Sequence, residues 1–166
     1  FLKREFDRIE NDFAFPFIAK IPRASSRGRG VYKICDSVQL GEYLEKTKFA
    51  YIQEYLPHEK DLRVILINYQ PVLAYWRWLA VGDFRTNVYQ GGVMDFDNIP
   101  QDVLELAQEG ARKCNFNDVG LDLLQSNGAW YVIEANMQYG REGLKKKNMV
   151  LKEVIREKLL AGTLFD

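Results

Sequence analysis

Three residues with metal-binding oxygen side chains, Asp122, Glu134 and Asn136, stand on either side of a turn signal at 126–128. This Ser-Asn-Gly signal separates two runs of high β propensity, so the segment should form a β-hairpin. Because side chains alternate along a strand, the length of the loop decides which face each acid takes. A three-residue loop puts all three oxygen side chains on one face, whereas a two-residue Asn-Gly loop separates the acids. We expect the three-residue loop, because it sorts the polar side chains from the apolar ones.

Two carboxylates on one face of a hairpin indicate metal binding. In the expected register Asp122 and Glu134 are diagonal neighbours, roughly 7–8 Å apart at the backbone. Carboxylates held that close repel each other unless a cation lies between them. Hard oxygen ligands suit Mg²⁺. The pattern alone leaves a solvent-facing hairpin with ordinary surface acids as the alternative.

A basic, glycine-rich loop at 25–30 has donors that match phosphate oxygens. It offers backbone N–H groups, two hydroxyls and two guanidiniums. Lys20 ends an apolar strand just before the loop, and a partly buried ammonium needs an anion to stay charged. The loop lacks the Gly-Lys-Ser/Thr ending of a Walker A motif. A solvated hairpin turn and a lysine that extends into water remain the alternatives.

Two further segments could complete a nucleotide site. Residues 51–56 join a compact N-terminal part to the rest of the chain, where an adenine could lie between two subdomains. The loop 84–92 carries Arg85 and Asn87 and closes on a double glycine, and an arginine there can stabilise phosphate charge that develops during transfer. A plain buried strand and a disordered loop are the respective alternatives.

The elements that must position these residues are strands in adjacent pairs, with helices between the pairs. This order predicts an α+β fold with largely antiparallel sheets. The chain opens directly in a helical pattern without a leading Met or cap, which we interpret as part of a longer protein. The expected strands are 14–21, 31–34, 49–55, 61–68, 71–79 and the hairpin, and the expected helices are 1–12, 37–48, 100–114 and 148–160, with a basic-polar loop over 137–147.

Composition places the chain among ordinary globular proteins. It has 166 residues, 47% of them hydrophobic, and 23 basic residues balance 23 acidic ones. A neutral chain has no global field to attract nucleic acid or an anionic membrane, and no apolar run approaches the ~20 residues of a membrane helix. We interpret Cys35 and Cys114 as buried thiols in a reducing compartment, and expect a cytoplasmic protein.

Read in order, these segments resemble the motifs of the ATP-grasp superfamily, and within it the ribosomal-protein glutamate ligases and glutathione synthetase-like carboxylate-amine ligases. The series extends over nearly the whole chain. The motifs are Phe15-Pro-Phe-Ile-Ala-Lys20, the loop Ser25 to Gly30 with Val31, Gln53-Glu-Tyr55, Asp61-Leu-Arg63, Phe84-Arg-Thr-Asn-Val-Tyr-Gln-Gly-Gly92, Gly120-Leu-Asp-Leu-Leu124 and Ile133-Glu-Ala-Asn136.

The resemblance implies an α+β ATP-grasp fold. It would consist of a partial leading helix at 1–12, a small lid subdomain at 13–55 and a larger antiparallel-sheet catalytic subdomain at 56–166, while the N-terminal substrate domain of the relatives is absent from this chain. The implied ligands are ATP and one or two Mg²⁺ ions, for which Mn²⁺ could substitute.

The resemblance also implies roles for individual residues. Lys20 would contact the phosphates, with Ser25, Ser26, Arg27, Gly28 and Gly30 as a phosphate lid. Gln53, Glu54 and Tyr55 would hold adenine, and Asp61 would bind ribose or a nearby nucleotide group. Arg85, Thr86 and Asn87 would bind the γ-phosphate and then the acyl phosphate, with Arg85 and Asn87 as catalytic residues. Asp122, Glu134 and Asn136 would be the metal ligands.

In that family a carboxylate attacks the γ-phosphate to give an acyl phosphate, and an amine then displaces phosphate to form an amide. The expected substrates are an amino-acid or peptide-like carboxylate and amine, including a protein tail, with neither nucleic acid nor membrane as a partner. A homo-oligomer is left open. Met137-Gln-Tyr-Gly140 stands where relatives often have a Pro-Gly turn, and the lid carries Arg27 and Arg29. A non-catalytic ATP-binding module and a single-strand nucleic-acid binder are the alternative functions.

Overall fold

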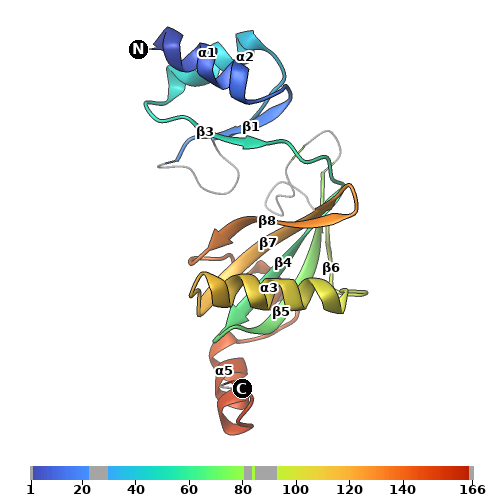
Figure 1. Cartoon of the computed structure of the whole chain (residues 1–166). Coiled ribbons are helices and arrows are strands. Elements are labelled where there is room, and N and C mark those ends of the chain that lie inside the picture. The colour runs from blue at the N-terminus through green and yellow to red at the C-terminus, as the bar shows by residue number, and fades with distance from the viewer. Residues whose placement is uncertain (1, 23–29, 81–83, 85–92, 165–166) are drawn as a thin grey trace. The chain divides into compact units, whose positions relative to one another are not determined.

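The computed structural model describes residues 2–22, 30–80, 84 and 93–164. The chain divides into two compact units, unit 1 over Phe1–Pro57 and unit 2 over His58–Asp166 (Figure 1). Each unit contains an antiparallel sheet with helices packed on it. The expected α+β class is therefore confirmed.

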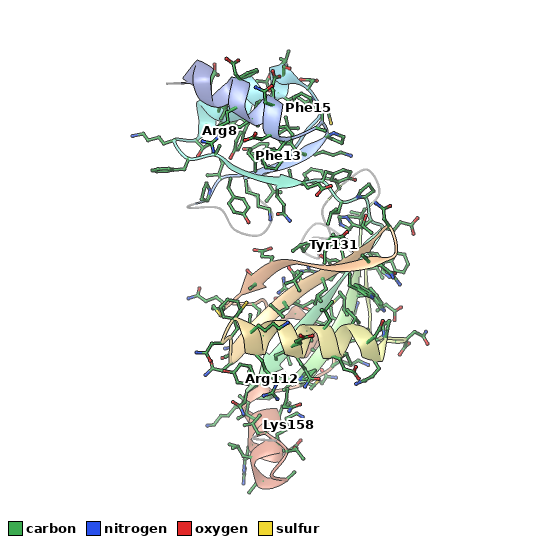
Figure 2. The ribbon with its side chains drawn as sticks, in the orientation of Figure 1. Arg8, Phe13, Phe15, Arg112, Tyr131 and Lys158 are labelled. Carbon is green, nitrogen blue, oxygen red and sulfur yellow. The ribbon has the colours of Figure 1, made fainter. Side chains whose placement is uncertain are left out.

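Unit 1 is a three-stranded sheet with two helices on one face. The strand order is β2-β1-β3, and both pairings are antiparallel. Phe13 and Phe15 contribute to this core (Figure 2), with ring centroids 6.0 and 5.2 Å from that of Phe17. The elements are α1 (Leu2–Asp12), β1 (Phe17–Lys20), β2 (Val31–Ile34), α2 (Ser37–Lys46) and β3 (Tyr51–Glu54).

Local chemistry explains where α2 begins and how it is attached. The Asp36 carboxylate accepts a hydrogen bond from the Gln39 N–H at 2.9 Å, which caps the first turn. One turn of α2 buries Leu40, Tyr43 and Leu44 at helical spacing. The Tyr43 hydroxyl donates to the Lys20 carbonyl at 2.6 Å and accepts from the Tyr51 N–H at 3.1 Å. One buried tyrosine therefore links the ends of β1 and β3.

Unit 2 is a five-stranded antiparallel sheet in the order β6-β5-β4-β7-β8. Figure 1 shows α3 lying across one face of this sheet. The elements are β4 (Lys60–Ile67), β5 (Gln70–Trp78), β6 (Met94–Asp95), α3 (Gln101–Lys113), β7 (Asp118–Ser126), β8 (Ala129–Asn136), α4 (Glu142–Lys146) and α5 (Leu151–Leu160).

The two faces of the larger sheet have different contents. One face packs against α3 through an apolar core. The other face is polar in its middle and carries a second apolar cluster, in which Leu144 of α4 packs with Ile65, Tyr75 and Met94. The buried residues of the α3 face are Leu62, Val64, Leu66, Trp76, Val119, Leu121 and Leu123 from the sheet and Val103, Ala107 and Ala111 from α3.

The β7–β8 hairpin has a shorter loop than we expected. Ser126 pairs with Ala129, so the loop is the two-residue Asn127-Gly128, and both residues have positive φ (51° and 79°), as a type I′ turn requires. The expected three-residue loop is wrong. A β-bulge nevertheless keeps the acids together, because β8 has one extra residue, Ile133, opposite the step from Asp122 to Leu123.

As a result Asp122 pairs directly with Glu134, and Gly120 pairs with Asn136. Directly opposed residues of an antiparallel pair share a face. The two acids and Asn136 therefore lie on one face, as expected, but for a different reason.

Other expectations differ from the structure in detail. The expected loop at 137–147 contains a short helix, α4, and the last helix begins at Leu151 rather than near 148. Cys35 and Cys114 are free, but both are exposed rather than buried. The helix expected over 1–12 is present as α1, and its Ile9 is part of the hydrophobic core of unit 1. Within the described residues, no helix has the length and apolarity that crossing a membrane requires.

Candidate functional site

Strand register builds a row of polar side chains across the face of the unit 2 sheet opposite α3. Arg63 on β4 pairs with Tyr75 on β5 and with Asp122 on β7, and Asp122 pairs in turn with Glu134 on β8. We call Tyr75, Arg63, Asp122 and Glu134 the polar row. One row further along the same face, Asp61 pairs with Arg77.

Two arginines and two aspartates of these rows form a buried ionic network. Arg63 donates to both oxygens of Asp122, with its Nη2 2.7 Å from Oδ2. Arg77 donates to both oxygens of Asp61, at 2.7 and 2.5 Å. The Nη2 of Arg77 also lies 2.9 Å from Asp122 Oδ2, so Arg77 joins the two aspartates. The Asp122 and Asp61 side chains are 4% and 2% exposed, so these pairs are shielded from water.

The contacts within the network favour the charged forms of Asp122 and Arg77. Burial by itself would raise the pKa of the Asp122 carboxyl, but the charges of Arg77 and Arg63 outweigh burial and hold this pKa below its ordinary value. Burial would lower the pKa of Arg77, and the carboxylates of Asp122 and Asp61 instead raise it. Two positive and two negative charges thus compensate each other inside the sheet face. The repulsion that we expected a metal ion to relieve is relieved here by arginine.

Glu134 and Asn136 are the accessible oxygen ligands of this face. Both lie on the edge strand β8, where Glu134 is exposed and Asn136 is half-buried. A carboxylate has about four acceptor positions, and three of those on Asp122 are used by Arg63 and Arg77. One acceptor position of Asp122 therefore remains, on the face that Asp122 shares with Glu134 and Asn136. Such a set of oxygens fits a hard cation such as Mg²⁺.

The segment after Asn136 is fixed by Tyr139, which stands where the sequence departs from the expected Pro-Gly turn. The Tyr139 hydroxyl donates to Asp118 Oδ1 at 2.8 Å. Its side chain packs on Gly120 so closely that a Cβ added to Gly120 would lie 2.6 Å from the Cβ of Tyr139. Burial and the hydrogen bond to Asp118 raise the pKa of Tyr139 above its ordinary value. Tyr139 therefore attaches this segment to β7, directly beside the polar row.

Unit 1 has a sheet face that its helices leave open. Along β1 the residues Phe17 and Ala19 point into the helical core, so Ile18 and Lys20 point to the other side. The partners of Ile18 and Lys20 on the neighbouring strands share that side. We call it the helix-free face. Its residues are Ile18, Lys20, Val31, Lys33, Tyr51 and Gln53.

Three residues expected to hold adenine lie at the end of β3. Gln53 belongs to the helix-free face, and within the described part of the chain its buried Oε1 has no hydrogen-bond partner. Glu54 pairs with Phe17, so its side chain belongs to the helical side, where it is exposed. Tyr55 follows the strand, and its ring lies under the ammonium of Lys33 at 3.9 Å.

Of the remaining expected site residues, the structure describes only Gly30 and Asp61. Gly30 has a φ of 74°, and its carbonyl accepts from the Ile21 N–H at 2.8 Å, which closes the base of the lid loop. Asp61 is buried against Arg77, so its carboxylate faces that guanidinium rather than an open surface. Ser25, Ser26, Arg27, Gly28, Arg85, Thr86 and Asn87 lie outside the described residues.

Sequence reasoning assigned no role to three residues that the structure places at these faces. Arg63 and Arg77 hold Asp122, and Lys33 stands on the helix-free face with Lys20. Strand alternation could have found Arg63, because it lies two residues after Asp61 and so on the same face. Lys33 could have been found as the charged residue of the strand Val-Tyr-Lys-Ile that follows the lid loop.

Comparisons with known proteins show the family of the chain and its fold. The model of the RimK-like ATP-grasp domain matches residues 3–161. Ribosomal protein bS6--L-glutamate ligase of Escherichia coli O7:K1 is 33% identical over 97 residues, which is 57% of this chain and 32% of that protein. A probable alpha-L-glutamate ligase of Shewanella loihica is 29% identical over 147 residues, 84% of this chain and 48% of that protein. The chain thus spans less than half the length of these curated relatives.

Solved structures show the same fold at low identity. The ATP-grasp ligase PsnB complexed with minimal precursor, Mg and ADP matches 96% of this chain and 50% of its own, with a TM-score of 0.68 and 18% identity. D-alanine--D-alanine ligase from Bacillus anthracis, complexed with ATP, matches 92% of this chain and 56% of its own, with a TM-score of 0.63 and 15% identity. Because the family model covers nearly the whole chain, this chain belongs to the RimK-like ATP-grasp domain family.

Proposed function

We propose that this chain is the ATP-grasp portion of an ATP- and Mg²⁺-dependent carboxylate-amine ligase that forms an amide bond through an acyl phosphate and releases ADP. The polar row carries the proposal. It places Glu134, with Asn136 beside it, next to a carboxylate that two buried arginines hold in its charged form. Membership in an ATP-grasp family supports the nucleotide, and relatives named as glutamate ligases support the reaction class.

On this proposal the residues of the two units bind different parts of the nucleotide and its metal ions. In unit 1, Lys20 binds phosphate, Ser25, Ser26, Arg27, Gly28 and Gly30 form the lid, and Gln53, Glu54 and Tyr55 hold the adenine. In unit 2, Arg85, Thr86 and Asn87 bind the γ-phosphate and then the acyl phosphate. Glu134, Asn136 and the remaining acceptor position of Asp122 hold one or two Mg²⁺ ions, with Mn²⁺ as a substitute.

The residue types suit a reaction in which negative charge grows on phosphate oxygens. Both proposed steps need positioning and positive charge rather than side-chain acid-base catalysis. Magnesium, when bound, would neutralise and orient phosphate oxygens. Arg63 and Arg77 do not take that place, because they are committed to Asp122 and Asp61. Their role is to keep Asp122 charged and immobile beside Glu134. Asp61 acts on the site through Arg77, which it orients.

The substrates follow from the relatives by analogy. One relative is named for ligating L-glutamate to a ribosomal protein, and PsnB was solved with a precursor peptide. We propose that one substrate is an amino acid and the other a polypeptide, such as a protein tail, with the reaction in the cytoplasm. If the complete protein forms an oligomer, we propose that it is a homo-oligomer.

Replacing Glu134 tests the metal assignment. We expect Glu134→Gln to abolish the increase in melting temperature that Mg²⁺ adds to nucleotide binding, because it removes a charged ligand. The melting temperature without ligand should not change, since Glu134 is exposed on an edge strand. Differential scanning fluorimetry with ADP, with and without Mg²⁺, measures both quantities.

Glu153→Gln, on the exposed side of α5, is the matched control and should keep the magnesium effect. An unchanged magnesium effect in Glu134→Gln would rule out Glu134 as a ligand. Phosphate release in the presence of ATP and a panel of amino acids then separates a ligase from a non-catalytic ATP-binding module, which would bind nucleotide without turnover.

A further inference from the structure

The helix-free face of unit 1 carries a second lysine for which neither the family motifs nor our sequence analysis gave a role. Lys33 on β2 pairs with Ile18, and Ile18 pairs on its other side with Gln53 on β3. Lys33, Ile18 and Gln53 therefore form one row across the sheet. Lys20 lies in the next row of the same face, between Val31 and Tyr51.

Both lysines of this face lie over tyrosine rings of the β3 segment. The Lys33 ammonium is 3.9 Å from the centroid of the Tyr55 ring, and the Lys20 ammonium is 5.5 Å from that of Tyr51. A cation over an aromatic face is weakly held at an exposed site, by roughly 0.5–1 kcal/mol. An ammonium binds a phosphate oxygen more strongly, through a charge-assisted hydrogen bond. A phosphate can therefore replace the tyrosine ring as the partner of each lysine.

The row of Lys33 also contains an unpaired acceptor. Gln53 Oε1 is buried, and the described residues provide it with no hydrogen-bond donor. A buried acceptor without a partner is costly, so its presence on this face indicates a ligand that donates a hydrogen bond. An amino group on a nucleotide base is such a donor. Lys33 and Gln53 together therefore offer one cation and one acceptor in a single row.

We propose that Lys33 is a second nucleotide-binding cation, which leaves the Tyr55 ring and binds a phosphate of the nucleotide together with Lys20. This inference rests on the proposed ATP binding and adds a residue to it. It also gives Tyr55 a second role, because its ring holds the Lys33 side chain on the helix-free face.

Nucleotide affinities of lysine variants test the proposal. We expect Lys33→Met to weaken the binding of ADP and ATP about tenfold, since it removes one charge-assisted hydrogen bond. Adenosine, which has no phosphate, should bind equally to Lys33→Met and to the original protein. Lys33→Arg should keep most of the affinity because it keeps the charge. Isothermal titration calorimetry of the purified protein with ADP, ATP and adenosine measures these constants.

Lys46→Met is the matched control. Its ammonium also lies near a tyrosine ring, 6.0 Å from the centroid of Tyr32, but Tyr32 packs with the helical core. Lys46 donates to the carbonyl of Glu42 within α2. Removing it deletes a lysine and a tyrosine contact without touching the helix-free face, so nucleotide affinity should not change.

Three results would overturn the inference. Wild-type affinity of Lys33→Met for ADP would exclude a phosphate contact, while leaving the proposed ligase function intact. Equal losses for adenosine and ADP would indicate that Lys33 supports the sheet rather than binds phosphate. Absence of nucleotide binding by the original protein would refute both the inference and the proposed function. If Lys33→Met does not fold, Lys33→Gln is measured in its place and judged by the same comparison.

Discussion

At the scale of single residues, the charge of Asp122 is the central feature of unit 2. An aspartate this deeply buried would be neutral without compensation. Arg63 and Arg77 provide that compensation through three contacts, and they leave one acceptor position on the carboxylate. The two arginines therefore determine both the charge of Asp122 and the number of bonds it can still make.

Removing Arg63 should destabilise the fold in a pH-dependent way. We expect Arg63→Met to lower the free energy of unfolding at pH 7 by about 3 kcal/mol, because Asp122 loses one of its two positive partners. The pKa of Asp122 is lowered in the folded protein, so its contribution to stability is present above the ordinary carboxyl pKa and is lost as pH falls through the lowered value. In the variant that pKa rises. Urea unfolding between pH 3 and pH 7 should show the largest difference at neutral pH and a smaller one in acid.

Arg8→Met is the control for this measurement. Arg8 and Asp12 form an exposed pair one turn apart on α1, with 73% and 57% of their side chains accessible. Pairs of this kind contribute little to stability. The unfolding midpoint should therefore not change, and an equal loss from Arg8→Met and Arg63→Met would contradict the role assigned to the buried network.

At the scale of elements, two short irregular features position the site. The bulge at Ile133 brings Glu134 opposite Asp122, although the two-residue turn alone would have separated them. The short helix α4 is attached to the same sheet face by Leu144 and by a close approach of Gly143 to the Tyr75 ring. Both features lie next to the polar row, since Tyr75 and Glu134 form its two ends.

A glycine-to-alanine pair tests the docking of α4. A Cβ on Gly143 would overlap the buried ring of Tyr75, so we expect Gly143→Ala to lower the free energy of unfolding by about 1–3 kcal/mol. Gly110 lies inside α3 with open space around it, so Gly110→Ala should instead raise stability by about 0.5–1 kcal/mol. Chemical denaturation measures both changes. A stabilising Gly143→Ala would show that α4 is not held against Tyr75.

At the scale of the whole molecule, the two units differ in how much core each contains. Unit 2 covers residues 58–166 and has apolar clusters on both faces of its sheet. Unit 1 covers 57 residues, and those of them that the structure describes form one cluster, between the sheet and the helices. Small units bury a smaller fraction of their surface and are correspondingly less stable alone. We therefore expect unit 2 to be more stable than unit 1 when each is produced alone.

A fragment experiment checks this expectation. The polypeptide of residues 58–166 should unfold in one cooperative thermal transition followed by circular dichroism, because it contains both clusters intact. Gly143→Ala should lower its stability by the same amount as in the whole chain, which shows that the fragment keeps the native packing. A broad, non-cooperative melt, or no effect of Gly143→Ala, would mean that unit 2 depends on unit 1.

Much of the fold and several site residues followed from the sequence, because they depend on near neighbours in the chain. Hydrophobic spacing placed α2 and α3 within a few residues, and alternation placed the strands on both sides of Asn127-Gly128. The order of motifs indicated the ATP-grasp family, and the family match confirms it. The turn signal at 126–128 placed Asp122, Glu134 and Asn136 on one strand pair, since a hairpin is a local structure.

The partners of these residues were decided only by the tertiary structure. Arg63 and Asp122 are 59 positions apart, and their pairing depends on the register of β4 against β7. The bulge at Ile133 is likewise a property of two paired strands, so the length of the turn could not reveal it. Local patterns determine which residue types a strand presents. Pairing between distant strands determines which charged partner each side chain contacts. For Asp122 the partners are two arginines.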